Sequence, residues 1–206
     1  YKEFFTMAVG TGFSHPVVAL YTYENAQVKH TNKMSLGRGV SVNVDPEVAD
    51  DNKFYADNVL AEAVAGLFTG GTGTVTVDGL DATAAKMIFG LANTRTVSAG
   101  GSSVTVQGYS DAEPPFCTLG YIYRRMMNGT TTYIPTVLTK VKFNIPSKAW
   151  NTQEESIDWQ TQEISFNIFR DDTTNHEWMF EPTTGMADEA DAITFLDAML
   201  SATISA

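Results

Sequence analysis

The sequence predicts a mainly β protein in which antiparallel strands pack as a sandwich or a barrel-like sheet, flanked by helices. Short runs alternate between apolar and polar residues, which is typical of antiparallel sheets with one buried and one solvated face. An Asn-Gly pair lies between two long apolar runs and predicts a hairpin. Only two segments show clear helical spacing, so the fold class is mainly β (α+β), with a flanking helix and an acidic C-terminal helix.

Four segments carry the alternation. In residues 40–45 and 163–168, apolar side chains are expected on one face and polar ones on the other. Residues 74–78 repeat the pattern, and residues 104–106 show it briefly. The residues expected on buried faces are Val40, Val42, Val44, Val75, Val77, Val104, Val106, Ile164, Phe166 and Ile168.

The best local prediction is the hairpin formed by residues 121–127 and 130–143. Asn128 and Gly129 tolerate the positive φ angles that a type I′ turn requires. Pro135 in the return strand indicates an edge or a bulge. Apolar residues point both ways in the middle of that strand, so we expect both of its faces to be covered, by another sheet or by another subunit.

Two helices are expected. The first follows Asp78 or Asp81 as N-cap, and its apolar residues at helical spacing are Leu80, Ala84, Met87, Ile88 and Leu91. The second begins with acidic residues that favour a helix N-terminus, namely Asp188, Glu189 and Asp191. Its apolar stripe consists of Ile193, Leu196 and Leu200, with Ala192, Phe195 and Met199 beside it.

The remaining segments have no clear period. Residues 57–68 fit a helix by composition and a strand by alternation, and the pattern leaves both open. Residues 98–103 are rich in Gly and Ser and are expected to form a flexible loop. The chain lacks internal repeats, and we expect residues 1–206 to form a single domain.

The charge distribution limits the classes of partner. The net charge of −11 argues against wrapping nucleic acid, because affinity for phosphate depends on Lys and Arg. Residues 114–153 contain five basic and no acidic side chains, whereas residues 154–206 contain twelve acidic ones and only Arg170. These regions are either complementary faces for self-association or simply solvated faces. No apolar run is long enough for a transmembrane helix, so no membrane partner is expected.

Catalytic and metal-binding patterns are missing, so we expect no enzyme, cofactor or metal. His15, His30 and His176 show no ligand spacing. Cys117 is interpreted as a small buried hydrophobe, because no activating base is recognisable beside it. Glycines 70, 71 and 73 lack the Lys-Ser/Thr end of a P-loop and are expected in a turn or bulge. Residues 171–175 lack a full calcium-loop pattern and are expected to form a hairpin loop.

The order of several motifs resembles the major tail proteins that form the tail tube of long-tailed phages, in particular the group called phi13-type. The resemblance spans roughly residues 36–200, and the motifs are structural. They are residues 42–50 (VNVDPEVAD), 53–62 (KFYADNVLAE), 68–71 (FTGG), 78–80 (DGL), 120–121 (GY), 140–143 (KVKF), 146–147 (PS), 160–161 (QT) and the acidic C-terminal helix. Residues 6–33 show little similarity, and residues 1–35 are therefore expected to be an N-terminal segment or arm.

This resemblance implies a structural virion protein that forms hexameric rings stacked into a hollow tube for DNA ejection. It implies assembly in the host cytoplasm, with tape-measure and tail-terminator proteins as further partners. It makes residues 57–68 mostly strand and residues 45–57 a projecting inter-subunit loop, in which the contact residues are Asp50, Asp51, Lys53, Phe54 and Tyr55. An acidic or uncharged lumen leaves DNA mobile, and the candidate lumen residues are Ser41, Asn43 and Asp45, or Glu163, Ser165 and Asn167.

Two other functions remain open. One is a β-sandwich binding module for carbohydrate or adhesion, in which aromatic side chains form a stacking platform. Its candidate residues are Tyr21, Tyr23, Tyr121, Tyr123 and Tyr133. The other is the related tube protein of a bacterial secretion or injection machine, which shares the fold and carries a different cargo.

Overall fold

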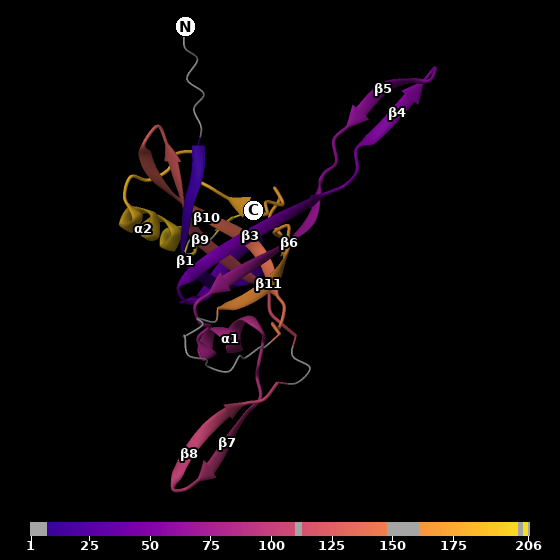
Figure 1. The fold of residues 1–206 in the computed structure, drawn as a ribbon. Helices are drawn as coiled ribbons and strands as arrows, with labels where there is room; N and C mark the ends of the chain where they lie inside the picture. The colour runs from indigo at the N-terminus through magenta and orange to yellow at the C-terminus, as the bar shows by residue number, and fades with distance from the viewer. Residues whose placement is uncertain (1–7, 110–112, 148–160, 202–203, 206) are drawn as a thin grey trace, which may run out of the picture.

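The structure, a computed structural model, describes residues 8–109, 113–147, 161–201 and 204–205. Within them the chain is mainly β, with antiparallel sheets and two flanking helices, as predicted (Figure 1). The large sheet consists of β1 (Ala8–Glu24), β2 (Gln27–Ser35), β3 (Gly39–Val48), β6 (Phe68–Val77), β9 (Cys117–Met127), β10 (Thr130–Phe143), β11 (Gln162–Phe169), β12 (Met179–Phe180) and β13 (Ile204–Ser205). The other elements are β4 (Asn52–Ala56), β5 (Val59–Val64), β7 (Thr94–Ala99), β8 (Ser102–Gln107), α1 (Ala82–Ile88) and α2 (Glu189–Met199).

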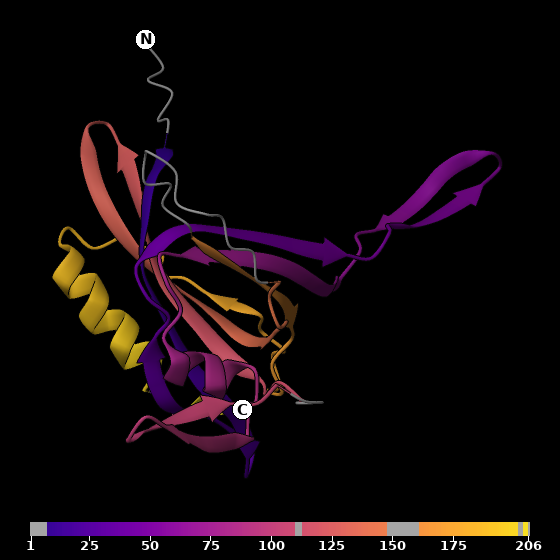
Figure 2. The same ribbon diagram turned by 60° about the horizontal axis from the view of Figure 1, so that its bottom comes forward.

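The large sheet is wrapped around a common interior. Its strands follow the order β13-β2-β1-β9-β10-β11-β6-β3, with β12 beside β10. The curvature of the sheet brings β3 back to β1. The Phe13 ring of β1 lies so close to the backbone of Gly39 in β3 that a Cβ atom added there would be 2.3 Å from the ring. Just before β3, the Leu36 amide donates to the Pro16 carbonyl at 3.0 Å. The sheet is therefore sandwich-like and nearly closed, and its curvature is visible in Figure 2.

The interior confirms most of the predicted alternation. In β6 and β11 the inward residues Val75, Val77, Ile164, Phe166 and Ile168 are almost fully buried. The glycines of residues 70–73 lie inside β6, so the predicted turn is wrong. The predicted bulge is present beside Gly70, where the register on β3 shifts between the pairs Glu47–Gly70 and Val48–Phe68. Position 73 requires glycine because a larger residue would clash: a Cβ atom there would lie 2.5 Å from the Phe166 ring.

Val40 and the pair Val104 and Val106 do not follow the prediction. The register of β3 on β6 shifts between Gly39 and Ser41, so Val40 is the extra residue of a bulge and is exposed. Val104 and Val106 lie on β8, which pairs only with β7 in the described part of the chain, and both side chains are exposed.

The Asn-Gly hairpin forms as predicted between β9 and β10. Met127 pairs with Thr130, and Asn128 and Gly129 have φ angles of 51° and 77°, as a type I′ turn requires. Pro135 lies in a stretch of β10 that pairs with β9 on one side. On its other side, β10 pairs with Met186 at Tyr133 and with β12 from Val137 onward, and Pro135 lies in the unpaired gap between them. This position fits an edge, where the missing amide hydrogen of proline costs no ladder hydrogen bond.

Helix α2 covers the outer face of β9 and β10, so these strands are buried on both sides. The second face of β10 is therefore covered within the subunit, by a helix, which neither predicted alternative named. The residues of this outer core are Val17, Ile122, Val137, Ala192, Leu196 and Leu200. The buried stripe of α2 runs through Ala192 rather than Ile193, and Phe195 faces solvent.

Helix α1 closes one end of the interior. The carboxylate of Asp81 caps it by accepting from the amides of Thr83 and Ala84, at 2.8 and 3.4 Å. Ala84 and Ile88 are fully buried against the main core, in agreement with the predicted helical face. Among the described residues, no helix is long and apolar enough to cross a lipid bilayer.

Residues 8–35 belong to the large sheet, so this part of the predicted N-terminal segment does not form an arm. Residues 8–35 form β1 and β2, and β1 lies between β2 and β9. Residues 1–7 lie outside the described part. The register of β1 on β9 shifts between Gly10 and Gly12 and again between Ser14 and Val17. These irregularities interrupt the period of two and explain why the sequence pattern did not reveal the strand.

Candidate functional site

The two candidate lumen segments lie on one continuous polar face of β3, β6 and β11. Residues directly opposite each other in an antiparallel pair share a face. Three rows cross the strands: Ser41–Thr76–Glu163, Asn43–Thr74–Ser165 and Asp45–Thr72–Asn167. The sequence analysis treated residues 41–45 and 163–167 as alternatives, and the structure joins them through the threonines of β6.

Side-chain hydrogen bonds link residues on and beside this polar face. The Asn43 amide donates to the Asp45 carboxylate at 2.5 Å, and the Asn144 amide donates to the Ser165 hydroxyl at 3.2 Å. The charged members of the three rows are Asp45 and Glu163, both acidic. Lys142 of β10 adjoins the third row opposite Asn167. The acidic and neutral side chains of the three rows repel phosphate or leave it unbound, whereas Lys142 at their β10 edge has the opposite charge.

The first projecting hairpin is formed by β4 and β5. β3 and β6 lead into it from the body, and both views show it extending away from the sheet (Figures 1 and 2). Residues 45–57, expected as a loop, are mostly strand, because β3 runs to Val48 and β4 begins at Asn52. Residues 57–68 are a turn, strand β5 and the start of β6. This agrees with the strand assignment and excludes the helix.

Of the five predicted contact residues, Asp50, Asp51 and Lys53 are exposed. The Asp51 carboxylate accepts from the Gly66 amide at 3.2 Å and so ties the base of the hairpin together. The side chains of Phe54 and Tyr55 lie outside the described part. Three large apolar side chains around the hairpin base are exposed: Val48, Val64 and Leu67.

The second hairpin, β7–β8, projects below α1 in Figure 1. Its turn is Gly100-Gly101, with φ angles of 57° and 80°, so the segment expected as a flexible loop is an ordered hairpin. Val97 pairs with Val104 and Arg95 pairs with Val106, which places three valines on one face. All three valines are exposed. The opposite face carries Thr, Ser and Gln107.

The described residues provide no group of three or more His, Cys, Asp or Glu side chains arranged to hold a metal ion. Cys117 is fully buried, and burial raises the pKa of its thiol to about 12. It therefore stays protonated and packs as a small hydrophobe. In the loop of residues 171–175, the buried Asp171 carboxylate accepts from the Thr173 amide and hydroxyl, at 3.2 and 2.7 Å.

The tyrosines of the binding-module hypothesis do not form a common platform. Tyr121 is buried in the main core and Tyr123 packs against it, whereas Tyr133 packs on the outer core beneath α2. Tyr21 is buried, and its hydroxyl donates to Asp172 at 2.8 Å. Tyr23 is exposed near the end of β1. A sugar-stacking surface needs several exposed rings side by side, and these residues do not supply one.

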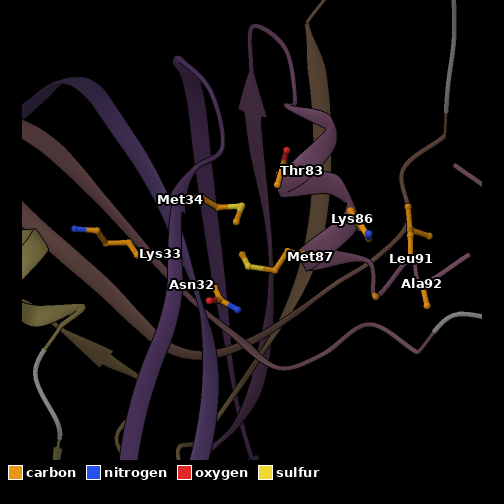
Figure 3. A pocket seen from close by; sticks show the side chains of 9 residues that line it. Asn32, Lys33, Met34, Thr83, Lys86, Met87, Leu91 and Ala92 are labelled. Atoms are coloured by element: carbon orange, nitrogen blue, oxygen red, sulfur yellow. The ribbon is translucent and has the colours of Figure 1, made fainter. Parts of the chain in front are cut away.

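A groove lies between β2 and α1 (Figure 3). Met34 and Met87 point toward each other at its centre, and Lys33 and Lys86 lie at its rim. Lys33 is paired with Asp197 of α2 at 2.8 Å. The lining contains no histidine, cysteine or carboxylate side chain.

The sequence analysis missed a cluster that we call the Phe–Lys patch, consisting of Phe116, Lys140, Lys142 and Phe169. The two rings meet edge to face at a centroid distance of 5.5 Å, and both are more than a third exposed. The ammonium groups of Lys140 and Lys142 lie 4.5 and 5.5 Å from the centroid of Phe116. The alternation of β10 predicts that the lysines share a face, but only the fold brings the two rings beside them.

Comparison with known proteins finds no matching family and no similar curated sequence. The geometric features that bear on function are therefore the polar face, the two hairpins and the Phe–Lys patch.

Proposed function

We propose that this chain is a structural subunit of a phage tail tube, forming hexameric rings that stack around a channel for DNA. The observation that carries the proposal is the pair of projecting hairpins with exposed apolar side chains. In this role the chain assembles with copies of itself in the virion and works without catalysis or a cofactor.

An isolated two-stranded hairpin is at best marginally stable in water. The β4–β5 and β7–β8 hairpins each form a separate two-stranded sheet, and both extend from the body (Figure 1). The exposed valines of β7–β8 and the exposed Val48, Val64 and Leu67 beside β4–β5 gain stability only when another surface covers them. Neighbouring copies of the same chain supply that surface in a ring or a stack of rings.

The free edge of the sheet supports the same function. Among the described strands, β3 pairs only with β6, and β13 covers only Gln27 and Val28 of β2. Unpaired edges invite addition of further strands. Head-to-tail contacts that close into a ring control such addition, and stacked rings extend it into a tube.

We assign the polar face of β3, β6 and β11 to the channel wall. A conduit for DNA has to repel phosphate or ignore it, and the three rows carry only hydroxyl, amide and carboxylate side chains. Tape-measure and tail-terminator proteins are the further partners that this role requires.

Negative-stain microscopy of the purified chain tests the proposal directly. Rings or tubes with a central channel are expected as concentration rises. A monomer that persists at high concentration would contradict it.

A second test targets the β4–β5 hairpin. Replacing Phe54 and Tyr55 by Ser is expected to impair tube formation while the monomer keeps its free energy of unfolding, because a partner pocket loses two aromatic anchors. Tyr23→Ser is the matched control, since this exposed tyrosine lies on β1 of the body. An equal loss of monomer stability in the hairpin variant would place both rings in the subunit's own core.

The same features fit the tube protein of a bacterial secretion or injection machine. The two functions differ in what passes through the channel. A neighbouring gene for a tape-measure or terminator protein distinguishes the phage tail from the secretion machine.

A further inference from the structure

We propose that the Phe–Lys patch of one copy docks on the outer face of helix α2 of the next copy. This inference rests on the proposed function only in requiring that copies of the chain associate. The proposed contact between neighbouring copies involves neither the β4–β5 nor the β7–β8 hairpin.

Lys140 of the Phe–Lys patch is held in place before any partner arrives. Lys140 donates to both oxygens of the Asp172 carboxylate, at 2.9 and 2.7 Å, and Asp172 also accepts from Tyr21. Partial burial opposes ionisation of Asp172, but the hydrogen bonds from Lys140 and Tyr21 prevail and lower its pKa below the usual value. The charged pair therefore persists at neutral pH and keeps Lys140 beside the Phe116 ring.

Lys142 is the cation of the patch with the weaker partner. Its ammonium group lies 3.5 Å from the carboxylate of Glu113, a side chain that is 91% exposed. An exposed pair of this kind contributes little and exchanges readily for another carboxylate. Beside it, Phe116 and Phe169 expose 37% and 38% of their surface. The patch thus fits a partner that presents an apolar ring next to a carboxylate.

The outer face of α2 has that chemistry. Asp188, Asp191, Phe195 and Ala198 are exposed and follow one another at spacings of three, four and three residues, which places them along one side of the helix. Phe195 is 45% exposed. The helix carries no basic residue in its last turn.

The two surfaces cannot meet within one subunit. Phe195 lies on the exposed side of α2, facing away from β9 and β10, on which the opposite side of the helix packs through Leu196. The patch lysines belong to β10 of the sheet itself. Contact between them is therefore heterologous, running from one copy to the next, and such contacts generate rings or helical filaments. Opposite charges on the two surfaces steer the copies into this orientation.

Charge reversal tests the contact in the full chain. Lys142→Glu and Asp191→Lys are each expected to raise the concentration for half-maximal assembly by about tenfold, because each places like charges together. The double variant restores an opposite-charge pair and is expected to assemble within about threefold of wild type. Sedimentation velocity measures the association, electron microscopy shows its form, and thermal melting of each variant checks the fold. Lys29→Glu, the same charge change on β2, is the control and should assemble like wild type.

The outcomes separate this inference from the proposed function. If the double variant recovers association but the particles are not tubes, the contact holds and the tail-tube function fails. If tubes form regardless of charge reversal, the function holds and the contact is wrong. If only Lys142→Glu impairs assembly and Asp191→Lys does not, the patch binds a surface other than α2, which also overturns the inference. A chain that stays monomeric contradicts both.

Discussion

The wrapped sheet and the two projecting hairpins are built from the same alternating strands, yet their valines have opposite environments. Val75 on β6 is fully buried, whereas Val104 on β8 is 60% exposed. The difference lies in what faces each strand: β6 has β11, β3 and the interior, and β8 has only β7 among the described strands. Alternation thus shows that a strand has an apolar face, and the surroundings decide whether that face is covered.

The largest loss of stability is expected in the body. Phe166→Ala removes a fully buried ring that packs edge to face on Phe143. It should lower the free energy of unfolding by about 3–5 kcal/mol. Phe169→Ala, three residues along the same strand, removes a partly exposed ring and should cost less than about 1 kcal/mol. Urea denaturation measures both, and equal losses would contradict the assignment of the core.

A matched valine pair sharpens the comparison. Val75→Ala should cost about 2 kcal/mol of unfolding free energy, because two buried methyl groups are lost. Val104→Ala should cost less than about 0.5 kcal/mol in the monomer and should weaken assembly instead. Denaturation and sedimentation of the same two proteins provide the measurement. A strong effect of Val104→Ala on monomer stability would show that β7–β8 packs within its own subunit.

The smallest effect is expected from His30 of β2. Burial lowers the pKa of its imidazole below 6.5, while the backbone of Met199 at the end of α2 opposes the shift. The unfolded chain therefore binds a proton more readily, and stability is lost as pH falls from 6.5 towards the lowered pKa. Wild type should lose more unfolding free energy between pH 7.5 and 5.5 than His30→Gln does. Identical pH profiles would contradict this account.

Local chemistry made several features predictable from the sequence. Asn128 and Gly129 determined a turn, Asp78 and Asp81 offered two candidate caps for one helix, of which Asp81 is the cap, and residues 163–168 had an unbroken period of two. The structure confirms all three. Each depends on neighbours in the chain, which is why no knowledge of the fold was needed.

Other features were hidden because the local signal was interrupted or ambiguous. The bulges of β1 broke its alternation, which hid the strand. Residues 1–35 were expected to be an N-terminal segment or arm because residues 6–33 show little similarity to the tail proteins. The alanines of residues 57–68 fitted either period. Gly100-Gly101 is one of the residue pairs that hairpin turns prefer, but the surrounding serines favoured the interpretation as a loop.

The candidate surfaces show the same limit. The sequence identified the polar residues 41–45 and 163–167, but only the register of β6 between β3 and β11 showed that they form one face. The Phe–Lys patch joins Phe116, which precedes β9, to β10 and the end of β11. Contacts between residues this far apart depend on the sheet order, which no local pattern encodes.

The sequence by itself determined the mainly β class, the hairpin at Asn128-Gly129, the two helices and the acidic balance of charge. These follow from turn chemistry, capping, periodicity and composition, which act over a few residues. The tertiary structure alone decided that β1 lies inside the sheet, that α2 covers the second face of β10, and that two hairpins leave the body with exposed valines. Those features depend on which surfaces pack together after the chain has folded. Whether a strand face is buried is decided by the element that packs on it, not by the strand itself.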